Sequence, residues 1–187
     1  MTDNLFQDKT KLNKSTSSVA TSLLDKIQRM KSQSKHNLLI DISGSMADWV
    51  ESNEGESFSK YQLMLTLLEK IPQNITKYAF DSGIEEITDI LPLPRGGTDM
   101  SRAFDYVKKK GKKEIVLITD GEPDSEKDAL LSAKGLKIDI IYIGQQPQPA
   151  FLDKLANATG GSFTNIDLIQ AGSVLELENK VQLLLGA

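Results

Sequence analysis

The chain has 187 residues and a formal net charge of −4, a length that suits one compact domain with a tail. The absence of cysteine excludes disulfides, thiolate zinc sites and iron–sulfur clusters, and it fits the reducing cytoplasm in which we expect the protein. The acidic balance argues against nucleic acid as a partner, and no apolar run is long enough to span a membrane.

The first 35 residues differ in composition from the rest of the chain. They hold seven Lys or Arg against three Asp, so a basic arm precedes an acidic remainder. Residues 1–18 are poor in large apolar groups, and we expect them to be disordered. A short amphipathic helix is predicted where apolar residues recur at helical spacing, at Val19, Leu23, Ile27 and Met30. We therefore divide the chain into an arm, 1–35, and a domain, 36–187.

Apolar strands alternate with helices from residue 36 onward. Strands are predicted over residues 37–42, 77–80, 84–88, 114–119 and 138–143, with an edge strand over 162–164. Helices are predicted over residues 61–70, 101–110, 125–134, 149–159 and 174–185. In the first helix the predicted buried face consists of Leu63, Leu65, Leu67 and Leu68. This order favours an α/β fold with a mostly parallel sheet that is covered on both faces. The turn between 77–80 and 84–88 is too short for a crossover, so one strand there should run antiparallel.

Three loops carry side chains that could share one site. They are residues 41–45, 96–99 and 119–124, and the first and last follow predicted strands. Ligands of parallel sheets bind outside the carboxyl ends of the strands, so we expect the loops to converge there.

The polar side chains of these loops are all hard oxygen donors. The candidate metal ligands are the carboxylates of Asp41 and Asp120 and the hydroxyls of Ser43, Ser45 and Thr98. Such donors suit Mg²⁺, with Ca²⁺ or Mn²⁺ as alternatives. Strand alternation could turn Asp41, Ser43 and Ser45 toward one ion, with Gly44 allowing a sharp turn and a close backbone approach. Only two of the five ligands are charged, so we expect a carboxylate of a partner protein to complete the coordination of the metal.

The pattern Asp41-x-Ser43-x-Ser45, then Thr98, then Asp120 in a Thr-Asp-Gly context resembles the metal-ion-dependent adhesion site (MIDAS) of von Willebrand factor A (vWA) domains. The resemblance covers about residues 36–187. It implies a doubly wound, Rossmann-like, mostly parallel sheet with one antiparallel edge strand and helices on both faces. It also implies that the three hydroxyls contact the metal directly, and that the two carboxylates act directly or through water. The implied activity is protein binding rather than catalysis, so no enzyme is expected. Assemblies that contain ATPases are implied as partners by analogy of fold alone.

Other interpretations compete with this one. Thr98 could be a helix N-cap, and Asp120 could belong to a simple turn. The main alternative function is a Mg²⁺-dependent phosphoester hydrolase with Asp41 as nucleophile, which resembles haloacid-dehalogenase-type phosphatases. Those enzymes need a second acid two positions later, where this chain has Ser43. Trp49 could either shape a contact surface or cover the core.

Overall fold

The computed structural model describes residues 36–53, 55, 57–88, 90–144, 147–170 and 172–186. The arm, with the helix predicted at 19–30, lies outside the described residues. The division of the chain at residue 35 therefore stays a prediction.

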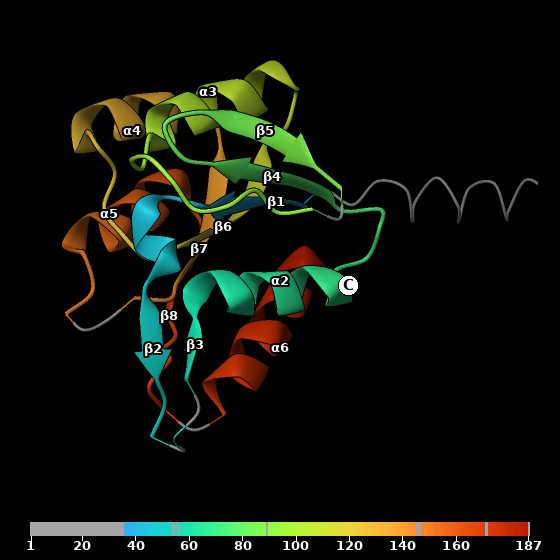
Figure 1. Cartoon of the computed structure of the whole chain (residues 1–187). Coiled ribbons are helices and arrows are strands. Elements are labelled where there is room, and N and C mark those ends of the chain that lie inside the picture. The colour runs from blue at the N-terminus through green and yellow to red at the C-terminus, as the bar shows by residue number, and fades with distance from the viewer. Residues whose placement is uncertain are drawn as a thin grey trace, which may run out of the picture. The chain divides into compact units, whose positions relative to one another are not determined.

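Six strands form one sheet in the order β5-β4-β1-β6-β7-β8 (Figure 1). The strands are β1 (His36–Asp41), β4 (Thr76–Phe80), β5 (Ile84–Ile87), β6 (Glu114–Thr119), β7 (Lys137–Tyr142) and β8 (Phe163–Asn165). All neighbouring pairs are parallel except β4 with β5, which closes one edge of the sheet. This confirms the predicted mostly parallel sheet with one antiparallel edge strand, because the short link at 81–83 allows only a hairpin.

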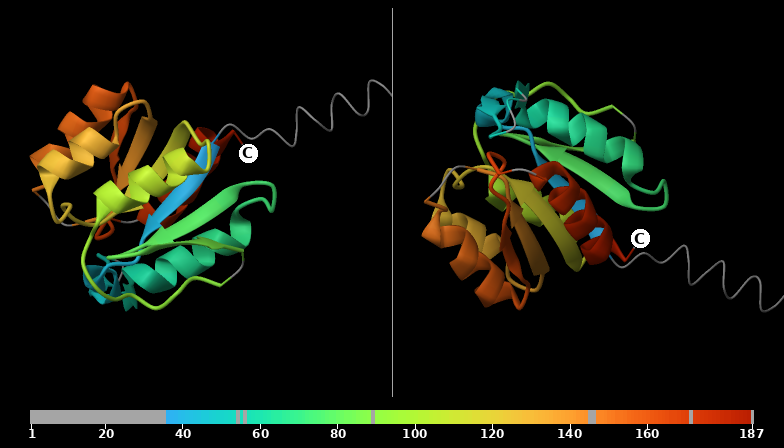
Figure 2. Two further views of the ribbon diagram at one scale, coloured as in Figure 1. Left: turned by 90° about the horizontal axis from the view of Figure 1, so that it is seen from above. Right: turned by 90° about the horizontal axis from the view of Figure 1, so that it is seen from below.

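Helices cover both faces of the sheet (Figures 1 and 2). The helices are α2 (Lys60–Lys70), α3 (Met100–Lys109), α4 (Glu126–Ser132), α5 (Ala150–Thr159) and α6 (Ser173–Leu185). Strand side chains alternate between two cores: Leu38 and Ile40 share one core with α2 and α6, whereas Leu39 belongs to the core of α3, α4 and α5. The doubly wound arrangement is therefore confirmed. None of the helices in the described ranges is both long and apolar enough to cross a membrane.

Helix α2 begins one residue before its predicted start, because Ser59 caps it. The Ser59 hydroxyl accepts a hydrogen bond from the Gln62 amide, and the Gln62 side chain accepts one from the Ser59 amide. The buried face of this helix was partly mispredicted: Leu65 is 37% exposed. It lies about 200° around the helix from Leu63, so both cannot face one core.

A short helix and a hairpin of two strands between β1 and α2 were not predicted. A short 3₁₀ helix, η1 (Gly44–Ala47), follows β1, and β2 (Trp49–Glu51) pairs with β3 (Ser57–Ser59) as an antiparallel hairpin. Both are too short to show a clear hydrophobic period. The hairpin brings the start of α2 back beside the end of β1, where the Lys60 amide donates to the Asp48 carbonyl over 3.2 Å.

Candidate metal centre

The candidate ligands lie where β1 and β6 end side by side. From this point the chain leaves β1 toward α2 on one face and leaves β6 toward α4 on the other face, so this is the switch point of the sheet. The register pairs Ile40 with Ile118 and thereby sets Asp41 beside Thr119. The Thr119 hydroxyl donates to Asp41 Oδ2 over 2.6 Å. Adjacent parallel strands thus place the first carboxylate of the centre.

Four of the five predicted ligands form one continuous hydrogen-bonded chain. The Ser43 amide donates to Asp41 Oδ1 over 2.8 Å. The hydroxyls of Ser43 and Ser45 lie 3.2 Å apart, and Ser45 Oγ donates to Asp120 Oδ1 over 2.8 Å. Residues from two loops, 75 positions apart at Ser45 and Asp120, therefore meet at one point.

Ser45 reaches this point by a turn and not by the predicted strand alternation. Ser43 is still extended, but Ser45 lies inside η1, where the Met46 amide donates to the Ser43 carbonyl over 3.0 Å. The close backbone approach predicted at Gly44 is present, since its amide lies 3.2 Å from the Gly96 carbonyl oxygen, but a Cβ at Gly44 would meet that oxygen at an ordinary 3.6 Å. Glycine is favoured more strongly at Gly96, which has φ +66° and would place a Cβ 2.9 Å from Ser82 Oγ.

The loop that carries Thr98 is tied to the other two loops by backbone hydrogen bonds, whereas the Thr98 hydroxyl is not part of the hydrogen-bonded chain from Asp41 to Asp120. The Gly44 amide donates to the Gly96 carbonyl over 3.2 Å, which ties the Thr98 loop to the end of β1. The Thr98 amide donates to Asp124 Oδ1 over 3.0 Å, and the Asp124 amide donates back to the Thr98 carbonyl over 3.0 Å. Thr98 is not the N-cap of α3. Asp99 is, since its carboxylate accepts from the Arg102 amide.

The candidate ligands range from fully buried to solvent-exposed. Asp41 is fully buried and Asp120 is 8% exposed, whereas Ser45 is exposed. Burial raises the pKa of Asp41 from 3.8 to about 6, although hydrogen bonds from Thr119 and Ser43 oppose the shift. Asp41 is therefore chiefly ionised at neutral pH, at a cost that a nearby cation would reduce. Ser45 marks the side from which a ligand can approach.

A lysine that the sequence interpretation missed completes the centre. Lys60 is 7% exposed, and its Nζ lies 2.5 Å from Asp120 Oδ2 and 3.3 Å from the Ser45 carbonyl oxygen. The exposed carboxylate of Asp48 lies 3.9 Å from the same Nζ. One local signal could have indicated it: a lysine directly after a Ser N-cap sits where the helix dipole disfavours a cation.

The donor chemistry of the centre fits a hard divalent cation. Hydroxyl and carboxylate oxygens are the ligands that Mg²⁺ takes, and two of them, Ser43 Oγ and Ser45 Oγ, already converge. Within the described ranges, no cluster of three or more Asp, Glu, His or Cys side chains is placed to hold a metal. An ion here would therefore depend on hydroxyls and two carboxylates, not on an all-carboxylate cage.

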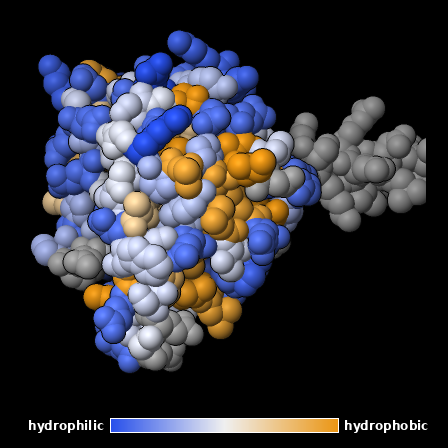
Figure 3. Space-filling view, in the orientation of Figure 1, coloured by the Kyte–Doolittle hydropathy of each residue, from blue (hydrophilic) through white to orange (hydrophobic). Residues whose placement is uncertain are grey.

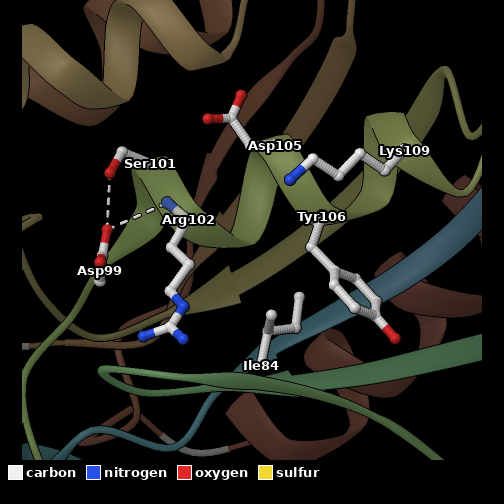
Figure 4. Close-up of a pocket in the computed structure, with 7 residues that line it drawn as sticks. All are labelled: Ile84, Asp99, Ser101, Arg102, Asp105, Tyr106 and Lys109. Carbon is white, nitrogen blue, oxygen red and sulfur yellow. Dashed lines mark hydrogen bonds between the residues drawn. The ribbon is translucent and has the colours of Figure 1, made fainter.

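A hollow of about 600 Å³ lies elsewhere, between β5 and α3 (Figure 4). It is lined by Ile84, Asp99, Ser101, Arg102, Asp105, Tyr106 and Lys109. Two of its polar groups serve local structure: Asp99 caps α3, and Arg102 donates to the Ser82 carbonyl over 2.8 Å. We find no converging set of donors there comparable to the one at the end of β1.

Comparison with protein-family profiles and with curated proteins gave no match. Solved structures share the fold, and two of them are vWA proteins. A von Willebrand factor type A protein from Catenulispora acidiphila matches 81% of this chain with a TM-score of 0.53 and 19% identity, and the chain spans 42% of its length. The SpRpn10 VWA domain matches 78% of this chain and 93% of its own, with a TM-score of 0.54 and 14% identity. At these identities the likeness is one of fold, and the chain accordingly has the α/β fold of vWA domains.

Proposed function

We propose that this chain is a metal-dependent protein-interaction module. It binds one divalent cation, Mg²⁺, through the MIDAS-like set of Asp41, Ser43, Ser45, Thr98 and Asp120. An Asp or Glu carboxylate of a partner protein then completes the coordination. The observation that carries the proposal is the hydrogen-bonded chain that runs from buried Asp41 through the Ser43 amide and hydroxyl to exposed Ser45 and on to Asp120.

The charge of the centre supports an acidic partner. Two carboxylates neutralise a divalent ion, and the hydroxyls add no further negative charge. The loaded centre therefore carries no net negative charge that would repel an external carboxylate, and the ion itself attracts one. Acidic residues on the surrounding loops would repel such a partner, so contact should centre on the ion itself.

Exposed apolar side chains give a partner further surface to contact. Trp49 is 65% exposed, which favours the contact-surface interpretation of this residue over core covering. In Figure 3 apolar side chains gather over the segment between β5 and α3, where Ile90 is 82% and Leu93 is 73% exposed. This segment leads directly into the Thr98 loop. An aromatic or leucine anchor beside a charged contact is a common arrangement in protein interfaces.

The hydrolase alternative receives less support. A nucleophilic Asp41 would have to reach a phosphorus atom, but Asp41 is fully buried, and both of its oxygens accept hydrogen bonds. Its surroundings suit a carboxylate that is held in place and neutralised. We therefore expect no turnover of phosphate esters. Under the protein-interaction proposal, proteins from ATPase-containing assemblies are one class of partner to test.

The test uses Mg²⁺ and a random peptide library. Calorimetry should show one Mg²⁺ bound by the full chain and none by Asp41→Asn. Peptides selected in Mg²⁺ should share an Asp or Glu and should elute with EDTA. Asp139→Asn, which changes a buried carboxylate on β7 away from the centre, should still bind both. Selection of peptides that lack acidic residues, or that remain bound to the protein in EDTA, would refute the proposal.

A further inference from the structure

Lys60 occupies an unfavourable place that calls for an explanation. It is the first residue of α2, where unpaired backbone N–H groups and the helix dipole disfavour a cation. It is also buried, which adds a desolvation cost. Its contacts with Asp120 Oδ2 and with the Ser45 carbonyl oxygen compensate for both costs. The ammonium is thus held by the same two residues that supply candidate metal ligands.

The position of the ammonium conflicts with a metal ion in the same centre. Asp120 uses one oxygen for Ser45 Oγ and the other for Lys60 Nζ, so both oxygens are engaged. A divalent cation beside Ser45 and Asp120 would lie within a few ångströms of the ammonium charge. At that separation in a partly buried site, repulsion between like charges is large.

A second carboxylate offers the ammonium an alternative position. Asp48 Oδ2 lies 3.9 Å from Lys60 Nζ, and the Asp48 side chain is 69% exposed. Lys60 and Asp48 are also joined through the backbone, where the Lys60 amide donates to the Asp48 carbonyl. A rotation of the long lysine side chain can therefore move its charge from Asp120 toward Asp48 and solvent, without moving α2.

We propose that Lys60 is an internal cation that neutralises Asp120 in the metal-free domain and competes with the divalent ion for it. The ion takes Asp120 as the ammonium swings to Asp48. Lys60 thereby weakens metal affinity and sets the Mg²⁺ concentration above which the module can hold a partner carboxylate. This inference deepens the proposed function and rests on it.

The first test measures Mg²⁺ affinity of the full chain by calorimetry. Lys60→Met removes the charge and keeps the length, and it should bind Mg²⁺ about tenfold more tightly or better. Lys60→Arg, which keeps the charge, should bind no more tightly than wild type. The matched control is Lys70→Met, which removes another ion-paired lysine of α2, the partner of Glu178, and it should leave Mg²⁺ affinity unchanged.

The outcomes separate the two proposals. If Lys60→Met binds Mg²⁺ no more tightly than wild type while Ser45→Ala abolishes binding, the competition is refuted and the proposed function stands. If neither wild type nor Lys60→Met binds Mg²⁺, both proposals are refuted.

A second test uses only the wild-type protein and so does not depend on the folding of a variant. Lysine acetylation followed by mass spectrometry should show Mg²⁺ accelerating modification of Lys60, with buried Lys77 as the internal control. An unchanged rate for Lys60 would refute the displacement.

Discussion

The raised pKa of Asp41 predicts a pH dependence of stability in the metal-free domain. Burial shifts this pKa from 3.8 to about 6, so the folded state holds the proton more tightly than the unfolded chain does. The favourable contribution of Asp41 is therefore complete below the unfolded pKa, and it is lost as the pH rises through the folded pKa.

The size of the effect follows from the shift. Each pKa unit corresponds to about 1.4 kcal/mol, so ionised Asp41 lowers the free energy of unfolding by about 3 kcal/mol at neutral pH. Because the folded and unfolded states bind protons differently, about 2 kcal/mol of this loss in the free energy of unfolding falls between about pH 4.5 and about pH 7.5. Other carboxylates titrate in the same range, so the comparison must be made against a variant that lacks this one group.

Urea unfolding in EDTA measures the difference. We expect wild type to lose about 2 kcal/mol relative to Asp41→Asn over that pH range, since the amide does not titrate. Asp139→Asn controls for the general cost of a buried amide. Excess Mg²⁺ should restore wild-type stability, by about 2.7 kcal/mol at one hundred times the dissociation constant. Identical pH profiles for wild type and Asp41→Asn would show that Asp41 is not held as a buried, titrating carboxylate.

Three further predictions follow from particular contacts. Gly97→Ala places a Cβ 2.8 Å from Asp124 Oδ1 and should loosen the Thr98 loop, weakening Mg²⁺ affinity about tenfold in calorimetry. Gly121→Ala, where a Cβ meets nothing within 4 Å, should leave that affinity unchanged. Burial raises the pKa of Tyr78 to about 12, so ultraviolet titration should show a late tyrosine step that Tyr78→Phe removes. Phe104→Ala, at a fully buried position, should cost about 3–5 kcal/mol in urea unfolding, and a loss below about 1 kcal/mol would contradict its core position.

Local pattern was sufficient to predict most of the regular structure. The largely apolar strands β1, β6 and β7 indicate burial on both faces, because a strand exposed on one face alternates apolar with polar residues. The hairpin β2–β3 was missed because strands of three residues carry too little period to detect. Leu65 was assigned to the core by residue type alone, although the helical repeat places it on the outer face.

The sequence by itself determined the fold class, the order of the longer elements and the set of hard oxygen donors, because these depend on residue type and on short-range spacing. Only the tertiary structure decided that a 3₁₀ turn carries Ser45 to Asp120 and that Asp124 holds the Thr98 loop. It also decided that Lys60 contacts Asp120, 60 positions further along the chain. Such contacts depend on strand order and on the path of a hairpin, and local sequence patterns predict neither of these.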